Sequence, residues 1–107
     1  MSLTFKEFKS LMLNIPKELL VFEDEPLKVT INKVRKTHND VKCYSADLTN
    51  SIAYFHFYYS IYKEFPDADA LNSISLNIPD TLVGNEYEFY KKLGVYFTMM
   101  GIKYLKC

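Results

Sequence analysis

The chain has 107 residues, which suits one domain with its own hydrophobic core and is too short for two. Lys and Arg together number 13, and so do Asp and Glu, so the formal net charge is zero. A neutral chain has no overall field to draw it to nucleic acid or to an anionic membrane. This balance argues against a membrane partner and makes nucleic acid the less favoured one.

Neither the cysteines nor the apolar runs point to a metal, a membrane or an oxidising compartment. Cys43 and Cys107 are the only cysteines, and neither has the short spacing to Cys or His that a zinc site needs. No apolar run reaches the roughly 18 residues of a membrane helix. Charged residues interrupt the N-terminal segment where a signal peptide would be apolar. We therefore expect a cytoplasmic protein without a metal or cofactor.

The first predicted element is a short helix over residues 5–13. Thr4 and Glu7 have the spacing of a capping box, in which each side chain accepts a hydrogen bond from the other residue's backbone N–H. Apolar residues then recur at helical spacing up to Pro16, which ends the pattern. A helix of under three turns is unstable alone, so it must dock on the rest of the protein.

Alternating residues predict three consecutive strands. The segment 27–32 places Leu27, Val29 and Ile31 on one face, which is typical of a half-buried strand. Turn-forming residues at 36–40 precede a second strand over 41–48. The segment 49–51 is short enough for a hairpin into a third strand over 54–62.

Aromatic residues dominate this third strand, and a period of two divides them between two faces. One face holds Ala53, Phe55, Phe57, Tyr59 and Ile61, and the other holds Ile52, Tyr54, His56, Tyr58, Ser60 and Tyr62. Tyrosine can pack, stack and donate a hydrogen bond. The second face therefore either completes the core of a small sheet or forms a binding surface, and the sequence leaves both interpretations open.

A fourth strand and a long helix complete the predicted fold. Alternation over 73–78 predicts the strand, and Asn85 stands at the N-cap of a helix predicted over 86–104. The main apolar stripe of this helix is Phe89, Tyr90, Leu93, Tyr96, Phe97, Met100 and Tyr104. We expect a single α+β domain over residues 1–107, with a short N-terminal helix, a four-stranded, largely antiparallel sheet and a long C-terminal helix packed on one face.

The C-terminal helix is also apolar on the side opposite its main stripe. Val95, Met99 and Ile102 lie there, where a helix packed on a sheet would carry polar residues. Single exposed apolar side chains are common, so these three either mean little or form a contact surface. Gly94 and Gly101 share one flank, and each lowers helix stability by about 1 kcal/mol, so we expect another element to approach the helix closely there.

The segment 28–42 is basic. Its cations are Lys28, Lys33, Arg35, Lys36 and Lys42. Beside sheet tyrosines they form the combination that binds single-stranded nucleic acid, with charges for phosphates and rings for bases. Arg35 is the only arginine of the chain, and a charged hairpin is also typical of a solvated turn or a protected sheet edge.

Catalysis would need a nucleophile beside a base, and Cys43 with His56 is the best pair. A hairpin that turns at Thr49 and Asn50 would bring them near one another. No third orienting residue and no oxyanion site is recognisable, so Cys43 is better interpreted as a small core residue and His56 as a polar sheet residue. We expect no enzymatic activity.

The sequence therefore predicts a small non-catalytic interaction module that binds a protein partner or a second copy of itself. The expected contact residues are Val95, Met99 and Ile102 on the helix and Tyr54, Tyr58 and Tyr62 on the sheet. The alternative is a single-stranded nucleic-acid-binding protein that uses Lys28, Lys33, Arg35, Tyr54 and Tyr58. Trp and Gln are absent while Lys, Asn, Tyr, Ile and Phe are plentiful, which suits an AT-rich genome. A small accessory or inhibitor protein of a mobile genetic element fits this size and composition.

Overall fold

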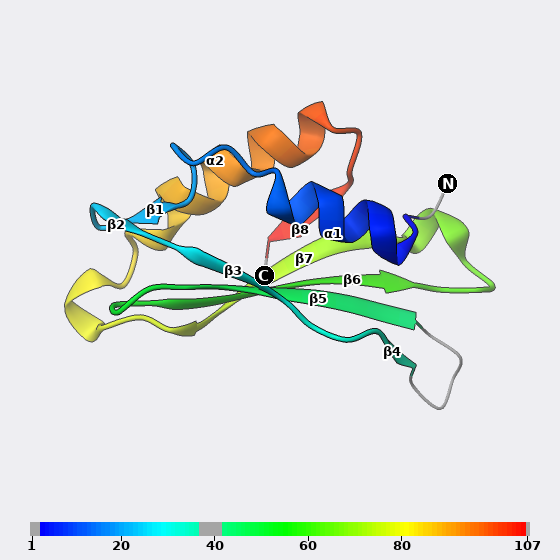
Figure 1. Ribbon diagram of the computed structural model, residues 1–107, viewed down its shortest axis with the longest axis horizontal. Coiled ribbons are helices and arrows are strands. Elements are labelled where there is room, and N and C mark those ends of the chain that lie inside the picture. The colour runs from blue at the N-terminus through cyan, green and yellow to red at the C-terminus, as the bar shows by residue number, and fades with distance from the viewer. Residues whose placement is uncertain (1–2, 37–41, 107) are drawn as a thin grey trace.

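The computed structural model describes residues 3–36 and 42–106, which form one layer of helices on one sheet (Figure 1). The helices are α1 (Phe5–Leu13) and α2 (Glu86–Met99), with short 3₁₀ helices η1 (Pro66–Ala68) and η2 (Asp80–Leu82). The strands are β1 (Val21–Phe22), β2 (Glu25–Pro26), β3 (Lys28–Ile31), β4 (Arg35–Lys36), β5 (Lys42–Thr49), β6 (Tyr54–Ile61), β7 (Ala70–Asn77) and β8 (Tyr104–Lys106). Most of the turn predicted at 36–40 lies outside the described residues.

The main sheet has six strands in the order β3-β5-β6-β7-β8, with β4 also paired to β5. All its pairs are antiparallel except β7 with β8, which is parallel. The α+β class is therefore confirmed, but the prediction of four largely antiparallel strands is wrong, because β4 and β8 enlarge the sheet and β8 makes it mixed. The strands β1 and β2 form a separate hairpin.

Both helices and the β1–β2 hairpin lie over the same face of the main sheet (Figure 1). In the described part of the chain, no helix covers the opposite face, which we call the uncovered sheet face. Neither helix within the described ranges is long and apolar enough to cross a membrane. The arrangement thus leaves two outer surfaces, one over the helices and one over the bare sheet.

The helix α1 forms as predicted. Thr4 Oγ1 accepts from the Glu7 N–H at 3.1 Å, and a Glu7 carboxylate oxygen accepts from the Thr4 N–H at 3.0 Å. Phe8 and Met12 are fully buried against the sheet, which supplies the docking that such a short helix requires. The capping box and the apolar spacing are local signals, so the sequence predicts both ends of this helix correctly.

The helix α2 ends earlier than predicted. The Gly101 N–H donates to the Thr98 carbonyl at 3.0 Å, and the Ile102 N–H donates to the Phe97 carbonyl at 2.9 Å. These two bonds form a Schellman motif, and Gly101 has the positive φ of 77° that the motif needs. The predicted extent of 86–104 is therefore wrong, and Tyr104 belongs to β8 instead of the helical stripe.

The glycines of this region have different roles. A Cβ on Gly94 would lie 3.3 Å from the Tyr104 ring, so the close approach expected at Gly94 is present. No described residue lies within 4 Å of a Cβ built on Gly101, whose positive φ serves the turn. Asn85 occupies the predicted N-cap position of α2, but its side chain makes no capping bond and donates to Glu23 at 2.9 Å.

The loop between β5 and β6 sets the register of the central strands. The Asn50 side-chain oxygen accepts from the N–H groups of Ile52 and Ala53 at 2.9 and 2.8 Å, which closes a loop over residues 50–53. With this loop, Asp47 pairs with His56 and Cys43 pairs with Ser60. The division of β6 between two faces is confirmed, because the residues at 55, 57 and 59 are buried in the core while those at 54, 56 and 58 remain partly exposed on the uncovered sheet face.

Candidate functional site

The structure places the predicted contact residues on opposite sides of the molecule. Val95 and Met99 lie on the outer side of α2, with 58% and 80% of their surface exposed. Tyr54 and Tyr58 lie on the uncovered sheet face, because they alternate with buried residues of β6. The sheet separates the two sets, so one flat contact with a partner cannot include both.

The outer side of α2 borders an apolar groove. This groove has a volume of about 540 Å³ and lies between α2 and the segment that follows α1. We call it the helix groove, and its lining residues are Asn14, Pro16, Leu19, Lys92, Val95, Tyr96, Met99 and Met100. Apolar side chains dominate it, which is typical of a site that binds apolar groups.

Tyr96 fixes the two sides of the helix groove relative to one another. It is 7% exposed, and its hydroxyl donates to the Leu11 carbonyl of α1 at 2.9 Å. Burial raises the pKa of Tyr96, so its hydroxyl stays protonated and keeps this bond at neutral pH. The groove is therefore built into the packing of α1 on α2 before any partner arrives.

The remaining predicted contact residues, Ile102 and Tyr62, also lie outside the helix groove. Ile102 follows the Gly101 turn and packs, partly buried, against the core. Tyr62 follows β6 and is 39% exposed, and its backbone N–H donates to the Asp69 carboxylate at 3.0 Å. The sequence predicts Ile102 on the same side as Val95 and Met99 only if the helix continues past Gly101, which it does not.

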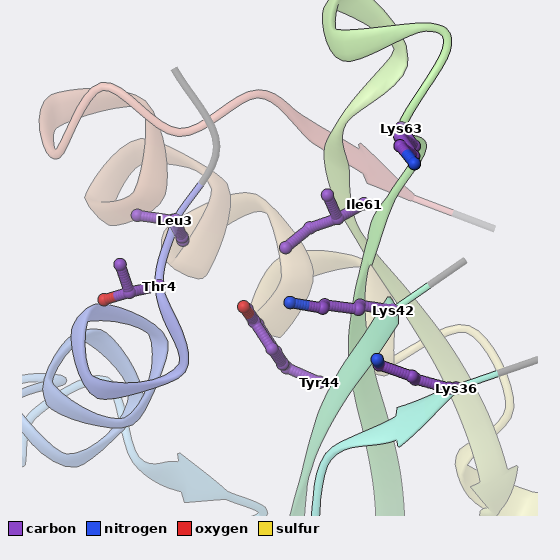
Figure 2. A pocket seen from close by; sticks show the side chains of 7 residues that line it. All are labelled: Leu3, Thr4, Lys36, Lys42, Tyr44, Ile61 and Lys63. Atoms are coloured by element: carbon purple, nitrogen blue, oxygen red, sulfur yellow. The ribbon is translucent and has the colours of Figure 1, made fainter. Parts of the chain in front are cut away.

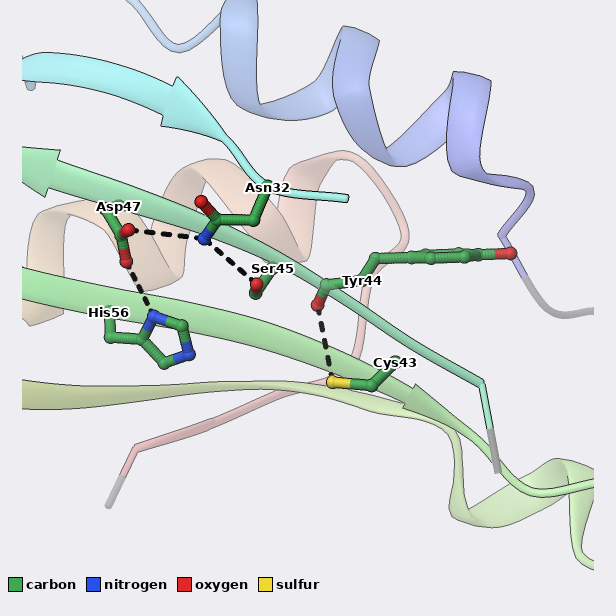
Figure 3. Close-up of polar contacts among 6 residues, drawn as sticks. All are labelled: Asn32, Cys43, Tyr44, Ser45, Asp47 and His56. Atoms are coloured by element: carbon green, nitrogen blue, oxygen red, sulfur yellow. Dashed lines mark hydrogen bonds and ion pairs between the residues drawn. The ribbon is translucent and has the colours of Figure 1, made fainter. Parts of the chain in front are cut away.

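On the uncovered sheet face, Asp47 is the centre of a polar network (Figure 3). One carboxylate oxygen lies 2.6 Å from His56 Nδ1, and the other accepts from the Asn32 amide at 3.2 Å. The Asn32 amide also donates to the Ser45 hydroxyl at 3.0 Å. The Tyr54 hydroxyl donates to Asp47 as well, and this bond is the main reason why the pKa of Tyr54 is raised. The network holds these side chains in fixed positions.

His56 is a partly exposed side chain that Asp47 and Tyr58 orient. Its Nδ1 bonds to Asp47, and its ring stacks on Tyr58 with centroids 5.8 Å apart, so Nε2 points away from the network (Figure 3). Cys43 pairs with Ser60 instead of His56, and its thiol donates to the Tyr44 carbonyl at 3.8 Å. The proximity of Cys43 and His56 expected from the sequence is therefore not formed.

The basic segment divides between the two sides of the sheet. Lys28 pairs with Thr49, and Arg35 pairs with Cys43, so both belong to the uncovered sheet face. Lys36 and Lys42 pair with one another and lie on the helix side, while Lys33 is exposed in the connection between β3 and β4. The register thus collects four of the five residues of the nucleic-acid alternative on one face.

Comparisons with protein-family models, with curated proteins and with solved structures find no match for this chain. Among the described residues, no three His, Cys, Asp or Glu side chains lie close enough together to hold a metal ion.

The sequence did not reveal the side of the helix groove that the segment after α1 forms, because Pro16 and Leu19 belong to no periodic pattern. It also missed the contact of Asp47 with His56, because it misplaced the hairpin turn.

Proposed function

We propose that this protein is a non-catalytic interaction module that binds a protein partner, or a second copy of itself, through the helix groove. The observation that carries the proposal is the concentration of exposed apolar side chains along this groove. Val95, Met99 and Met100 are 58%, 80% and 55% exposed. Val95 and Met99 lie one turn apart on α2, and Met100 directly follows its last residue. Isolated apolar residues are normal on a surface, but a contiguous concave set is typical of an interaction site.

The chemistry of the helix groove suits an apolar segment of a partner protein. Methionine is flexible and polarisable, so Met99 and Met100 can adjust to the shape of the side chains they meet. Pro16 and Tyr96 supply rigid walls, and Lys92 adds a cation that can pair with an acidic residue of the partner. Burial of Met99 in a contact would contribute favourably to binding, by about 1.5–3 kcal/mol if the side chain becomes fully buried.

Met99→Glu tests this proposal. The variant should fold with an unchanged thermal midpoint, because Met99 is 80% exposed, and it should lose binding, because a charge in a desolvated contact costs several kcal/mol. The matched control is Thr98→Glu, which adds the same charge at an exposed neighbour outside the groove. Sedimentation measures self-association, and affinity capture with the three immobilised proteins measures partner binding. A partner or dimer retained by Met99→Glu would rule out the groove as the interface.

A second candidate function is the binding of single-stranded nucleic acid on the uncovered sheet face. The specific observation in its favour is the register, which brings Lys28, Arg35, Tyr54 and Tyr58 to that face. Exposed rings beside cations are the usual means of binding single strands. Asp47 opposes this function, because its carboxylate lies among these residues and already holds the Tyr54 hydroxyl.

Titration of labelled oligonucleotides distinguishes the two candidates. We expect only weak binding, with a dissociation constant above about 1 μM at physiological salt, because the formal net charge is zero. Tighter binding that falls steeply with salt, and that is lost in Arg35→Ser but kept in Met99→Glu, would establish the nucleic-acid function instead. The two substitutions lie on opposite surfaces, so each serves as the control for the other.

A further inference from the structure

A basic pocket lies where β4, β5 and β6 meet the start of α1 (Figure 2). It has a volume of about 700 Å³, and Lys36, Lys42 and Lys63 line it. Lys42 lies opposite Lys36 on one side and opposite Ile61 on the other, and directly opposed residues share a face. The two strands therefore place two ammonium groups on the helix side of the sheet, and Lys63 adds a third from the segment after β6.

The three lysines have no acidic partner in the described part of the chain. None of the described lining residues is Asp or Glu, and the one ion pair among the described residues joins Asp47 to His56 on the other face of the sheet. Like charges that line one pocket repel one another, and the repulsion weakens when an anion enters. The described charged side chains that line the pocket are therefore all cations, which favours a negatively charged group.

Tyr44 is an independent sign of a ligand. It is only 6% exposed, and its ring packs against Phe5, Phe8 and Tyr59. No residue of the described chain bonds to its hydroxyl, although every fully buried side-chain oxygen or nitrogen there has a partner. The hydroxyl oxygen therefore reaches the pocket, where Figure 2 shows Lys42 extending toward it.

The Tyr44 hydroxyl is a hydrogen-bond donor at neutral pH. Burial raises the pKa of Tyr44, and Tyr59, Asp69 and Glu7 raise it further. A phenol with a raised pKa stays protonated, so it can donate to an anion beside the lysines. Hydrogen bonds in which one partner is charged are about twice as strong as neutral ones.

We propose that this basic pocket binds an organic phosphate monoester, with the phosphate held by the lysines and the Tyr44 hydroxyl. Three cations suit a phosphate, which carries a charge of about −1.5 to −2 at pH 7, better than a carboxylate with a single charge. Leu3 and Ile61 form an apolar wall beside the lysines, so the organic part of the ester would lie on them. The site differs from the helix groove and does not depend on the function proposed for it.

Calorimetric titration with phenyl phosphate tests the proposal. Phenyl phosphate should bind at least about tenfold more tightly than inorganic phosphate, because its ring contacts the apolar wall. Benzyl alcohol, which has the ring without the charge, should not bind. Equal affinity for phenyl phosphate and inorganic phosphate, or no binding of either, would overturn the proposal.

Variants assign the binding to the pocket. Tyr44→Phe keeps the buried ring and removes only the hydroxyl, and we expect about a tenfold loss of affinity for phenyl phosphate. Lys42→Gln should cause a loss of similar size, whereas the control Lys91→Gln, an exposed lysine of α2 outside the pocket, should cause none. Circular dichroism and thermal midpoints check that each variant folds. Unchanged affinity in both pocket variants would refute the assignment.

A lipid headgroup could supply the same phosphate, and sedimentation with vesicles containing phosphatidic acid separates the two sources. We expect the protein to bind phenyl phosphate in solution and to stay in the supernatant when vesicles are added, because the apolar wall is a small surface within a pocket. Co-sedimentation that Lys42→Gln abolishes, without measurable affinity for phenyl phosphate, would replace the soluble ligand by a membrane lipid.

Discussion

Gly94 of α2 faces the ring of Tyr104 in β8, and a Cβ added to this glycine would lie 3.3 Å from the ring atom Cδ2. Tyr104 cannot easily move away. Its hydroxyl bonds to the Ser73 hydroxyl at 2.6 Å, and its ring stacks on Phe57 with centroids 6.4 Å apart. The glycine therefore permits the helix and the parallel edge strand to pack together.

The first prediction concerns this contact. Gly94→Ala raises helix propensity by about 1 kcal/mol, but it forces a methyl group against a fixed ring, and such overpacking costs about 1–3 kcal/mol. We expect a net destabilisation of about 1 kcal/mol in urea unfolding. In a Tyr104→Ala background the same change should become stabilising, because the obstacle is gone. Stabilisation of the wild-type background would show that the packing of β8 on α2 is looser than the structure indicates.

The contact also shows why the C-terminal part was predicted incorrectly. Apolar residues continue at helical spacing through Ile102 and Tyr104, so periodicity alone extends the helix to 104. The helix ends at Met99, before the turn at Gly101, and the three residues of β8 are a strand only because β7 offers a parallel edge. Such a short strand depends on a partner far away in the sequence, which no local pattern reveals.

Elements with local signals were predicted well. The capping box of α1 and the alternation of β6 each depend on residues within one segment. The hairpin turn was placed at Thr49 and Asn50, whereas the loop covers 50–53, and this error preserved the face of every side chain but changed its partner. His56 thus meets Asp47 instead of Cys43. The basic pocket was not predicted, because Leu3 and Lys63 reach it from separate segments.

The second prediction is a stabilising change in the β1–β2 hairpin. Its two-residue loop consists of Glu23 and Asp24, with φ values of 54° and 60°. This left-handed conformation is unfavourable for residues other than glycine, so Asp24→Gly should stabilise the protein by about 0.5–1 kcal/mol in urea unfolding. Glu23→Gly should stabilise it less, because it removes the bond from Asn85 to Glu23. A lower midpoint for Asp24→Gly would contradict the assigned turn.

The third prediction is a pH dependence that comes from the capping box. In the folded protein, hydrogen bonding to Thr4 lowers the pKa of Glu7 from its usual 4.5. The bond with the Thr4 backbone is the larger cause, and the bond with the Thr4 side chain is the smaller one. A carboxyl with a depressed folded pKa stabilises the protein above its unfolded pKa, and this contribution is lost as the pH falls through the folded value. The stability difference between wild type and Glu7→Gln should therefore be largest at neutral pH and disappear in acid.

Urea unfolding of both proteins from pH 7 to pH 2 measures this difference. The loss should begin as the pH falls below about 4.5, the usual carboxyl value. Thr4→Ala provides the structural control, because removal of an N-cap hydroxyl costs about 1 kcal/mol at neutral pH. A difference between wild type and Glu7→Gln that stays constant over the whole range would mean that the Glu7 charge does not contribute to the cap.

The last prediction concerns the Asp47 network. Asp47→Asn replaces one accepting carboxylate oxygen by a donating NH2 group, so the side chain can no longer accept from all three of Asn32, His56 and Tyr54. A donor left without an acceptor costs about 1–3 kcal/mol when buried, and because these side chains are partly exposed we expect the free energy of unfolding to fall by about 1–2 kcal/mol.

The same change should lower the raised pKa of Tyr54 toward its usual value, since the bond to Asp47 is the main cause of the shift. NMR titration with ¹³C-labelled tyrosine resolves Tyr54, and the exposed Asp80→Asn is the control. If the pKa of Tyr54 is the same in Asp47→Asn and in wild type, the carboxylate does not hold the hydroxyl, and the uncovered sheet face is less ordered than the network implies.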